Sequence, residues 1–492
     1  MNLRPFLRNW IPPFVLAAAL GATYRLTLAP GLSWANHGAD GGDLITAAAT
    51  GGIAHPTGYP TYLILARLFQ LLPFGSIAFR TNLFSAVCMT AAAVLVYLLV
   101  IHFPAAPVRR NIMAGLVAAL AFGLAPLTWS QAVIAEVYGL HALLVSLFLY
   151  LLPWEGGKYE ERKKVLDPLA GLVLGLAIGN HVTALLLLPA LLLGCTGKGW
   201  HFSWKPLFVR LGGMAVGLLV YLILPLRAAS HPPVNWGNPA TAGGFLWLVS
   251  GRLYAGLPFS VPASQWAVKL TTWAGFLLTQ FSWIGLVLGL MGLLVLRFKP
   301  ATPYLVTGWI FVAFTIFSLG YHTTDAEVYL IPAILAFSIW VGCGSAWAME
   351  WFSRTRRWLG LAFGIGLTVV FAGLGAMNFS KADASGDRRA ELYGQAVMAA
   401  LPANALVFTS MDTDTFTMWF FQYVLHQRED VAVISKPFLP YQWYRDTLKF
   451  TYPKLAIPDR PGGIWQDVIA AANSARPNCE TLSIGQDFMF CH

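Results

Sequence analysis

The chain has 492 residues, of which 57% are hydrophobic and only 11% are charged. Soluble domains carry about a quarter charged residues, so this composition excludes a soluble globular enzyme, and its hydrophobicity excludes a disordered chain. Long apolar runs, rather than short alternating segments, also argue against a transmembrane β-barrel. The composition therefore predicts an α-helical polytopic membrane protein.

Apolar runs of roughly 20 residues, the length that spans a bilayer, predict about eleven transmembrane helices. The first run is expected to remain in the protein rather than to be cleaved as a signal peptide, because it has no small-residue cleavage site and Pro12-Pro13 stands at its start. The predicted spans are 11–29, 81–102, 112–128, 133–152, 167–180, 182–197, 207–226, 270–296, 303–320, 328–348 and 358–378.

The distribution of lysine and arginine predicts the orientation. With a cytoplasmic N-terminus and eleven crossings, sixteen basic residues of the membrane part face the cytoplasm and six face outside, as the positive-inside rule requires. Residues 1–378 then form the membrane part, with a first outer loop at about 30–79, and residues 379–492 lie outside. The six outer basic residues are Arg25, Arg67, Arg80, Arg227, Arg252 and Lys269.

Residues 379–492 have the composition of a soluble domain, with 10 Lys/Arg against 12 Asp/Glu. β-like runs at 405–409 and 431–435 alternate with helix-like segments, which predicts a small α/β extracytoplasmic domain. The net charge of +10 therefore comes from the membrane part and indicates topology rather than affinity for nucleic acid. Cys479 and Cys491 both lie in this domain. They either form a disulfide or remain as two free thiols, and the sequence does not decide between the two.

The ten acidic residues of the membrane part divide by side. Five lie in or beside cytoplasmic loops and are expected to be solvated charges, Asp167 among them. Because ionisable groups at the membrane boundary are costly unless they are paired or used, the other five predict a functional site. They map to three outer loops: Asp40, Asp43, Glu136, Asp325 and Glu327.

The first outer loop is the richest in candidate residues. Within it, 43–50 and 61–72 predict short helices along the membrane surface. Two interpretations of Asp40 stand. It is either the N-cap of a helix that begins at Gly41, with Asp43 completing a capping box, or a general base at the membrane surface. The same loop holds His37, His55 and Tyr59.

The later outer segments carry alternatives of the same kind. Glu136 is either a charge favoured by a helix N-terminus or part of the site. Tyr138 suits interhelical hydrogen bonding as well as substrate binding, and His181 follows Asn180 in what is either a polar turn or a binding segment. Candidates for contacting the substrate are His55, Tyr59, Tyr138, His181, Asn235, Trp236, Asp325 and Glu327.

Arg227 and Arg252 stand against the positive-inside trend. Snorkelling to the headgroups explains either residue alone. Together with the outer carboxylates, they indicate binding of a lipid phosphate or pyrophosphate.

A resemblance adds to this interpretation. The run Asp40-Gly-Gly-Asp43, followed by Ala54-His-Pro-Thr-Gly-Tyr-Pro60, resembles the opening signature of a bacterial family in the GT-C superfamily. That family is related to the animal O-mannosyltransferases that act on plexin-type domains. It more often shows Asp-Ser-Gly-Glu and His-Pro-Pro, so this chain keeps an acid at each end of the first motif. Supporting similarity lies at 224–227, 235–237, 325–329, 428–431 and 443–444.

The resemblance implies a GT-C-like fold and a polyprenyl-phosphate sugar as donor. It implies Asp40 as the base, with Asp43 and Glu136 as further catalytic candidates, and a donor phosphate near Arg227 or Arg252. The implied reaction is inverting transfer of a sugar, a mannose-like hexose being favoured, to a hydroxyl of a protein Ser/Thr or a glycan. It would take place at the outer face of a bacterial cytoplasmic membrane.

No cofactor is expected to be obligatory. A divalent cation, Mg²⁺ or Mn²⁺, would if used be held by Asp40, Glu136 and Asp325, since hard oxygen ligands suit these ions. The main rival function is a flippase or transporter of a sugar lipid, for which ionisable residues near mid-membrane are expected. A non-catalytic scaffold is a second rival, and it leaves the three acidic loops without a role.

Overall fold

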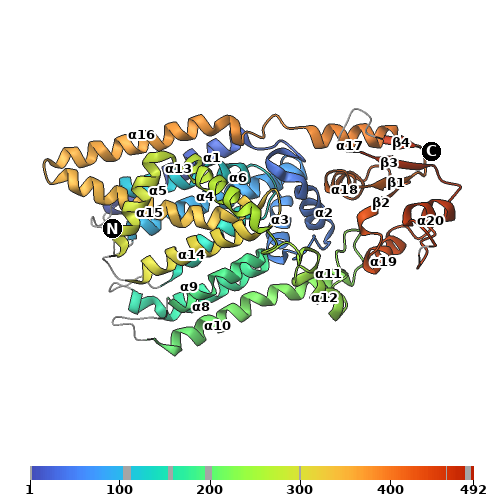
Figure 1. Cartoon of the computed structure of the whole chain (residues 1–492), viewed down its shortest axis with the longest axis horizontal. Coiled ribbons are helices and arrows are strands. Elements are labelled where there is room, and N and C mark those ends of the chain that lie inside the picture. The colour runs from blue at the N-terminus through green and yellow to red at the C-terminus, as the bar shows by residue number, and fades with distance from the viewer. Residues whose placement is uncertain are drawn as a thin grey trace.

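The computed structural model describes residues 3–102, 112–152, 159–193, 195, 202–297, 301–460, 462–482 and 489–491. A bundle of long helices forms one end of the molecule and a small α/β region forms the other (Figure 1). The helices of the bundle are α1 (Leu3–Thr27), α4 (Ile77–His102), α5 (Ile112–Gly123), α6 (Pro126–Ala132), α7 (Tyr138–Leu151), α8 (Tyr159–Asn180), α9 (Leu188–Leu193), α10 (Trp204–Leu218), α11 (Ile223–Ala228), α13 (Trp266–Arg297), α14 (Ala301–Gly320), α15 (Ile331–Ser353) and α16 (Arg357–Ala382).

Within the described residues, six helical segments are long and apolar enough to cross a membrane, or seven if the bent pair α5–α6 is one span. The six are 77–101, 204–228, 263–297, 302–320, 326–353 and 357–382. Each predicted span overlaps a helix or a run of consecutive helices, although the span 133–152 is helical only from Tyr138, and the predicted break at Asn180 is present. The count of eleven crossings stays a prediction.

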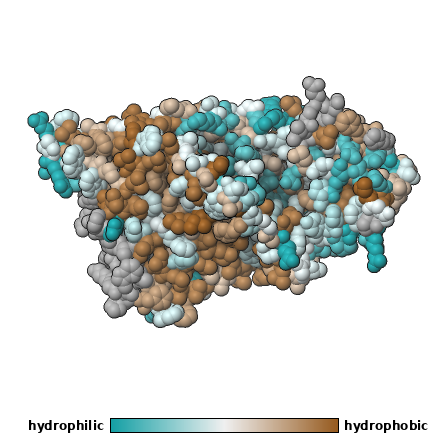
Figure 2. All heavy atoms as spheres, viewed as in Figure 1, coloured by the Kyte–Doolittle hydropathy of each residue, from teal (hydrophilic) through white to brown (hydrophobic). Residues whose placement is uncertain are grey.

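The central helix of the bundle is α15. Of its apolar stretch 94% is buried by protein, against 22% for the stretch that begins with α10 and 28% for α16. The last two therefore present apolar side chains outward, as expected of helices that face lipid. Figure 2 shows hydrophobic residues over much of the bundle and more hydrophilic ones over the α/β end.

Helices α8 and α10 approach each other through glycines. A Cβ on Gly171 of α8 would lie 1.9 Å from the carbonyl oxygen of Arg210, and one on Gly213 of α10 would lie 2.1 Å from that of Pro168. Small residues four apart are typical of close helix contacts in membranes, and Gly175 and Gly217 repeat the pattern one turn later.

This contact corrects one prediction. Asp167 is not a solvated charge: its Oδ1 accepts a hydrogen bond from Nε of Arg210 at 2.8 Å, and both side chains are buried. The two residues lie on the helices that the glycines bring together, so the charges are paired inside the protein. Buried charges persist in this way only when they are paired and hydrogen-bonded.

The outer loops fold between the bundle and the α/β region (Figure 1). The two short helices predicted in the first loop are present as α2 (Gly41–Thr50) and α3 (Pro60–Gln70). The loop pairs with the later outer segment, because Ile53 N–H donates to the carbonyl of Val234 at 2.8 Å. Further short elements are η1 (Ala35–Asp40), η2 (Val182–Leu187), η4 (Leu219–Leu222), α12 (Ala242–Val249), η5 (Arg252–Tyr254), η6 (Ala263–Gln265) and η7 (Ala326–Leu330).

The C-terminal region is built on a four-stranded sheet with strand order β2-β1-β3-β4. Strands β1 (Leu406–Thr409) and β2 (Ala432–Ser435) coincide with the predicted runs, and β3 (Asn478–Thr481) also pairs in parallel with β1. β4 (Met489–Cys491) is antiparallel to β3. The helices are α17 (Arg389–Ala400), α18 (Asp412–Trp419), η8 (Phe420–Val424), η9 (Lys436–Phe438), α19 (Gln442–Thr451) and α20 (Trp465–Ala472).

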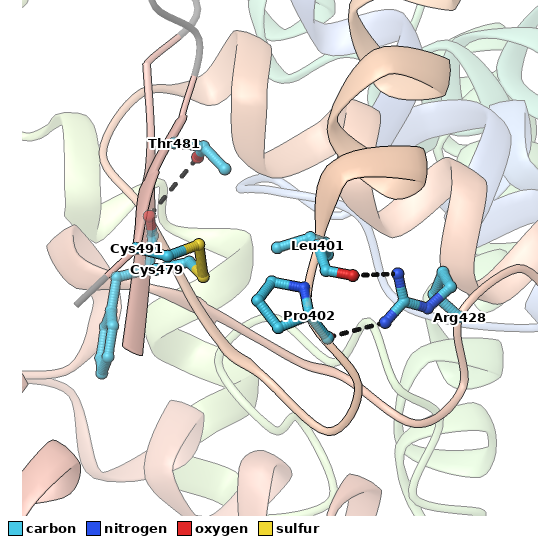
Figure 3. The surroundings of a disulfide bond; sticks show 7 residues. Leu401, Pro402, Arg428, Cys479, Thr481 and Cys491 are labelled. Carbon is cyan, nitrogen blue, oxygen red and sulfur yellow. Dashed lines mark hydrogen bonds between the residues drawn. A yellow bond between two sulfur atoms is a disulfide. The ribbon is translucent and has the colours of Figure 1, made fainter. Parts of the chain in front are cut away.

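A disulfide and the hydrogen bonds of one arginine stabilise this region (Figure 3). Cys479 on β3 and Cys491 on β4 are register partners and form a disulfide, which resolves the alternative that the sequence left open. Arg428 donates to the carbonyls of Leu401 and Pro402, at 2.7 and 2.8 Å. The basic residue of the 428–431 motif therefore supports the fold. The other three cysteines, Cys88, Cys195 and Cys343, are buried free thiols.

Candidate functional site

A cavity of about 700 Å³ lies where the first outer loop meets the later outer loops and the start of α18. Among the described residues that line it, none is a lysine or an arginine. Its lining combines carboxylates, histidines and aromatic rings. The lining residues used below are Trp34, Asp40, His55, Tyr59, Tyr138, His181, Tyr254, Asp325, Tyr329, Asp412 and Thr413.

Asp40, Asp43 and His55 form a connected group at the cavity wall. The carboxylate of Asp43 is fully buried: its Oδ2 lies 2.7 Å from Nδ1 of His55 and also accepts the backbone N–H of His55 at 2.9 Å. Nε2 of His55 lies 3.6 Å from Oδ2 of Asp40, whose side chain is 44% exposed. Asp43 thus orients the imidazole, and Asp40 is the carboxylate that a substrate can reach.

The capping interpretation of these two acids is wrong. Asp40 occupies the N-cap position of α2, but its side chain makes no capping hydrogen bond. Asp43 lies in the first turn, yet its oxygens bind His55 and the indole N–H of Trp236 rather than completing a capping box. The carboxylate of Asp40 therefore lines the cavity, that of Asp43 holds His55, and neither caps the start of α2.

The charges of this group influence one another. Burial raises the pKa of the Asp40 carboxyl above its usual range, and the carboxylates of Asp43 and Asp325 raise it further, while His55 opposes the shift. Burial alone would lower the pKa of His55, but Asp40 and Asp43 outweigh it and raise the pKa of His55 to about 9. At neutral pH the imidazole is therefore a cation, and it offsets part of the negative charge of the two acids.

Aromatic rings next to this group also line the cavity. The ring of Tyr59 lies 4.9 Å from that of His55 and stacks on His181 at 6.0 Å. Tyr329 lies 5.7 Å from His181 and 6.2 Å from Tyr138. Four residues predicted as substrate contacts, His55, Tyr59, Tyr138 and His181, are thus brought together. Flat apolar surface with a few placed polar groups is typical of small-molecule sites.

The other predicted site residues lie around the cavity in different ways. Asp325 lines it, whereas Glu327, two residues on, is not among the lining residues. Glu136 is buried behind the wall, with Oε2 3.3 Å from the backbone N–H of Val137. Asn235 forms a β-bridge with Ile53 and is also buried.

The two arginines predicted to bind phosphate do not line the cavity. Nη1 of Arg227 donates to the carbonyl of Gly52 at 3.3 Å, so this side chain supports the first outer loop. Arg252 is exposed and lies between Gly251 and Tyr254, both of which line the cavity. Only Arg252 is therefore near its edge.

A divalent cation is expected only as an optional cofactor, with Asp40, Glu136 and Asp325 as its ligands. In the part of the chain that the structure describes, no three His, Cys, Asp or Glu side chains are grouped so that they could hold a metal ion. The predicted set of Asp40, Glu136 and Asp325 is thus not arranged as a ligand shell.

The most notable lining residue without a sequence prediction is Asp412. It lies three residues after the last residue of β1, at the carboxyl end of a parallel strand, which is where α/β folds place ligand-binding residues. The predicted strand at 405–409 followed by Ser410-Met-Asp412-Thr-Asp414 was the signal available in the sequence. No pattern in the sequence shows that α18 lies against the membrane part.

The sequence matches one family of known proteins in two separate regions. Residues 40–202 match the family described as the Protein O-mannosyl-transferase TMEM260 N-terminal domain, and residues 390–458 match TMEM260-associated domain 2. The chain is 24% identical to Protein O-mannosyl-transferase TMEM260 of Mus musculus and to its Dictyostelium discoideum counterpart, over 92% and 94% of its length. It spans 66% and 62% of the length of those two relatives.

Among solved structures, ArnT from Cupriavidus metallidurans has a similar fold. The structure of ArnT bound to undecaprenyl phosphate matches 96% of this chain and 92% of its own, with a TM-score of 0.64 and 13% identity. The apo structure matches 96% of this chain and 93% of its own, with a TM-score of 0.63 and the same identity. The chain is therefore a membrane protein with a GT-C fold that is related to the TMEM260 protein O-mannosyl-transferases.

Proposed function

We propose that the chain is an inverting glycosyltransferase that moves a mannose-like hexose from a polyprenyl-phosphate donor to an acceptor hydroxyl, a protein serine or threonine being favoured. The observation that carries the proposal is the exposed carboxylate of Asp40 in an aromatic-lined cavity, next to a histidine that Asp43 holds in place. The names of the curated relatives support the choice of sugar and acceptor.

In the proposed reaction Asp40 accepts the proton of the acceptor hydroxyl. The hydroxyl oxygen attacks the anomeric carbon on the face opposite the phosphate, and the bond from that carbon to the phosphate oxygen breaks. The products are the inverted glycoside and the polyprenyl phosphate. Because phosphate is a reasonable leaving group, positioning and neutralisation of charge supply most of the rate enhancement.

The donor is proposed to keep its lipid in the bilayer and to present its phosphate at the cavity. The ArnT structure with bound undecaprenyl phosphate supports a lipid phosphate in this fold. We assign the phosphate contact to Arg252, which is exposed beside two lining residues. The His55 cation also lines the cavity, and its positive charge favours binding of an anion there. Arg227 is proposed to act indirectly, through its bond to Gly52.

The sugar is proposed to lie against Tyr59, Tyr138, His181 and Tyr329, with Asp325 binding its hydroxyls. Carboxylates accept strong hydrogen bonds from hydroxyl groups.

The proposed location is a bacterial cytoplasmic membrane, with the N-terminus in the cytoplasm and the cavity on the outer side. Two observations support this orientation: the bias of basic residues, and the disulfide of the C-terminal region, because disulfides persist in oxidising compartments.

The test is the substitution Asp40→Asn in the full-length protein, purified and placed in lipid nanodiscs. Transfer from radiolabelled polyprenyl-phosphate mannose to a peptide with serine and threonine should fall by about 10² to 10⁴, the range of a general base. The matched control is Asp467→Asn on α20, an exposed acid outside the cavity lining. Full transfer by the Asp40→Asn variant excludes Asp40 as the base. Movement of the sugar lipid across liposomes without transfer by the wild type would favour a flippase instead.

A further inference from the structure

The C-terminal region is fixed against the membrane part at the cavity. The backbone of Phe416, on α18, comes so close to Gly42, on α2, that a Cβ on this glycine would lie 2.8 Å from the carbonyl oxygen of Phe416. Trp236, from the outer loop before α12, has its ring 4.5 Å from that of Phe438 and 5.5 Å from that of Trp443. The start of α18 is therefore held at a defined place relative to Asp40.

The two acids at the start of α18 have different surroundings. Asp414 is buried and accepts the backbone N–H groups of Ser410 and Met411, at 3.1 and 2.7 Å, as well as the hydroxyl of Thr481. These hydrogen bonds stabilise the turn between β1 and α18. Asp412 is exposed and lines the cavity with Thr413. Because Asp414 already satisfies the turn, the carboxylate of Asp412 is available to a ligand.

The charge of the cavity indicates what kind of ligand suits it. Asp40, Asp325 and Asp412 all line it, the described lining includes no lysine or arginine, and the His55 cation offsets only part of this negative charge. Partial burial in the cavity wall, and then the charge of Asp40, raise the pKa of Asp412 to about 6, while His55 opposes the shift. A ligand that brings a positive charge to this side of the cavity relieves this repulsion, whereas an acidic ligand adds to it.

The position of α18 indicates which substrate meets Asp412. The C-terminal region lies beyond the helix bundle (Figure 1), so a donor anchored in the bilayer enters from the side of the helices. An acceptor from the aqueous phase enters from the side of α18. Resting on the proposed function, we infer that Asp412 is an acceptor-binding residue that favours polypeptides with a basic residue next to the modified hydroxyl.

The test compares two peptides that differ at one position beside the same serine or threonine, where one has lysine and the other glutamate. Full-length protein in nanodiscs is given polyprenyl-phosphate mannose, and kcat/KM is measured for each peptide and for a neutral alanine version. The wild type should prefer the lysine peptide over the glutamate peptide by about tenfold.

The variant Asp412→Asn should reduce that preference to about twofold, because its loss of kcat/KM is largest for the lysine peptide and smaller for the alanine peptide. The control Asp467→Asn should keep the full preference. Asp412→Glu, which retains the charge, should restore most of it.

The outcomes separate the two proposals. If Asp412→Asn keeps the wild-type preference, Asp412 does not select the acceptor by its charge, although the transferase assignment stands. If the wild type transfers to all three peptides equally, the charge argument is wrong. If it transfers to none of them, both the peptide acceptor and the role of Asp412 are overturned.

Discussion

The indole N–H of Trp236 donates a hydrogen bond to Oδ1 of Asp43, with 3.0 Å between nitrogen and oxygen. The other oxygen of the same carboxylate holds His55, whose far nitrogen faces Asp40. The ring of Trp236 in turn packs against Phe438 and Trp443 of the C-terminal region. One tryptophan thus connects the packing of the outer region to the orientation of the proposed catalytic group.

The variant Trp236→Phe is expected to lower the transfer rate about tenfold. It removes a hydrogen bond to a buried carboxylate, an interaction of about 1.5–3 kcal/mol, but keeps an aromatic ring in the cluster. The measurement is kcat with saturating donor and peptide. The control is Trp247→Phe, whose ring packs against Tyr441 and Trp443. Equal losses in the two variants would mean that packing, and not the bond to Asp43, sets the rate.

The rate of transfer is expected to depend on pH on both sides of neutrality. A general base must be ionised, and the pKa of Asp40 is raised by burial, so the acid limb should lie above the ordinary aspartate pKa of about 3.9. The pKa of His55 is raised to about 9, so its cation is fully present below its ordinary value of 6.5 and is lost as the pH rises through about 9. The alkaline limb should therefore fall near pH 9.

The variant His55→Gln tests the assignment of the alkaline limb. Glutamine cannot be protonated, so the rate should be lower at neutral pH and should no longer decline near pH 9. The same linkage predicts that the wild type, but not this variant, loses stability as the pH passes about 9. An unchanged alkaline limb in the variant would assign that limb to another group.

Much of the fold follows from residue patterns alone. Apolar runs located the helices, and the predicted strands at 405–409 and 431–435 are β1 and β2. Asp40, His55 and Tyr59 lie within one loop, so their shared cavity was within reach of local reasoning. These features depend on periodicity and on short separations along the chain, both of which a sequence displays.

The remaining parts of the site depend on packing between distant segments. The role of Asp43 is decided by Trp236, which lies far along the chain, and the capping interpretation failed because that partner was not visible. Asp412 joins the cavity only because α18 packs on α2. Arg210 pairs with Asp167 because two glycine-lined helices lie side by side. Loop charge alone cannot reveal such contacts.

The disulfide gives a test of the proposed orientation. Protein denatured without reduction should show three reactive thiols of the five cysteines, and all five after reduction. A double change of Cys479 and Cys491 to serine should cost the C-terminal region about 2–3 kcal/mol, as expected for a short closed loop. Alkylation with mass spectrometry and thermal unfolding measure the two effects. Five reactive thiols in protein trapped directly from cells would contradict an oxidising location.

The contact between α2 and α18 gives the last prediction. In Gly42→Ala the new methyl group meets the backbone of Phe416, which cannot turn aside as a side chain would. Overpacking of this kind costs about 1–3 kcal/mol, more than the gain of up to about 1 kcal/mol from replacing glycine in a helix. The variant should therefore unfold at a lower temperature and transfer more slowly, because Asp412 moves away from Asp40. Gly366→Ala on α16 is the control, since a Cβ there meets nothing within 4 Å. If both variants keep wild-type stability and rate, transfer does not depend on the close packing of α18 against α2.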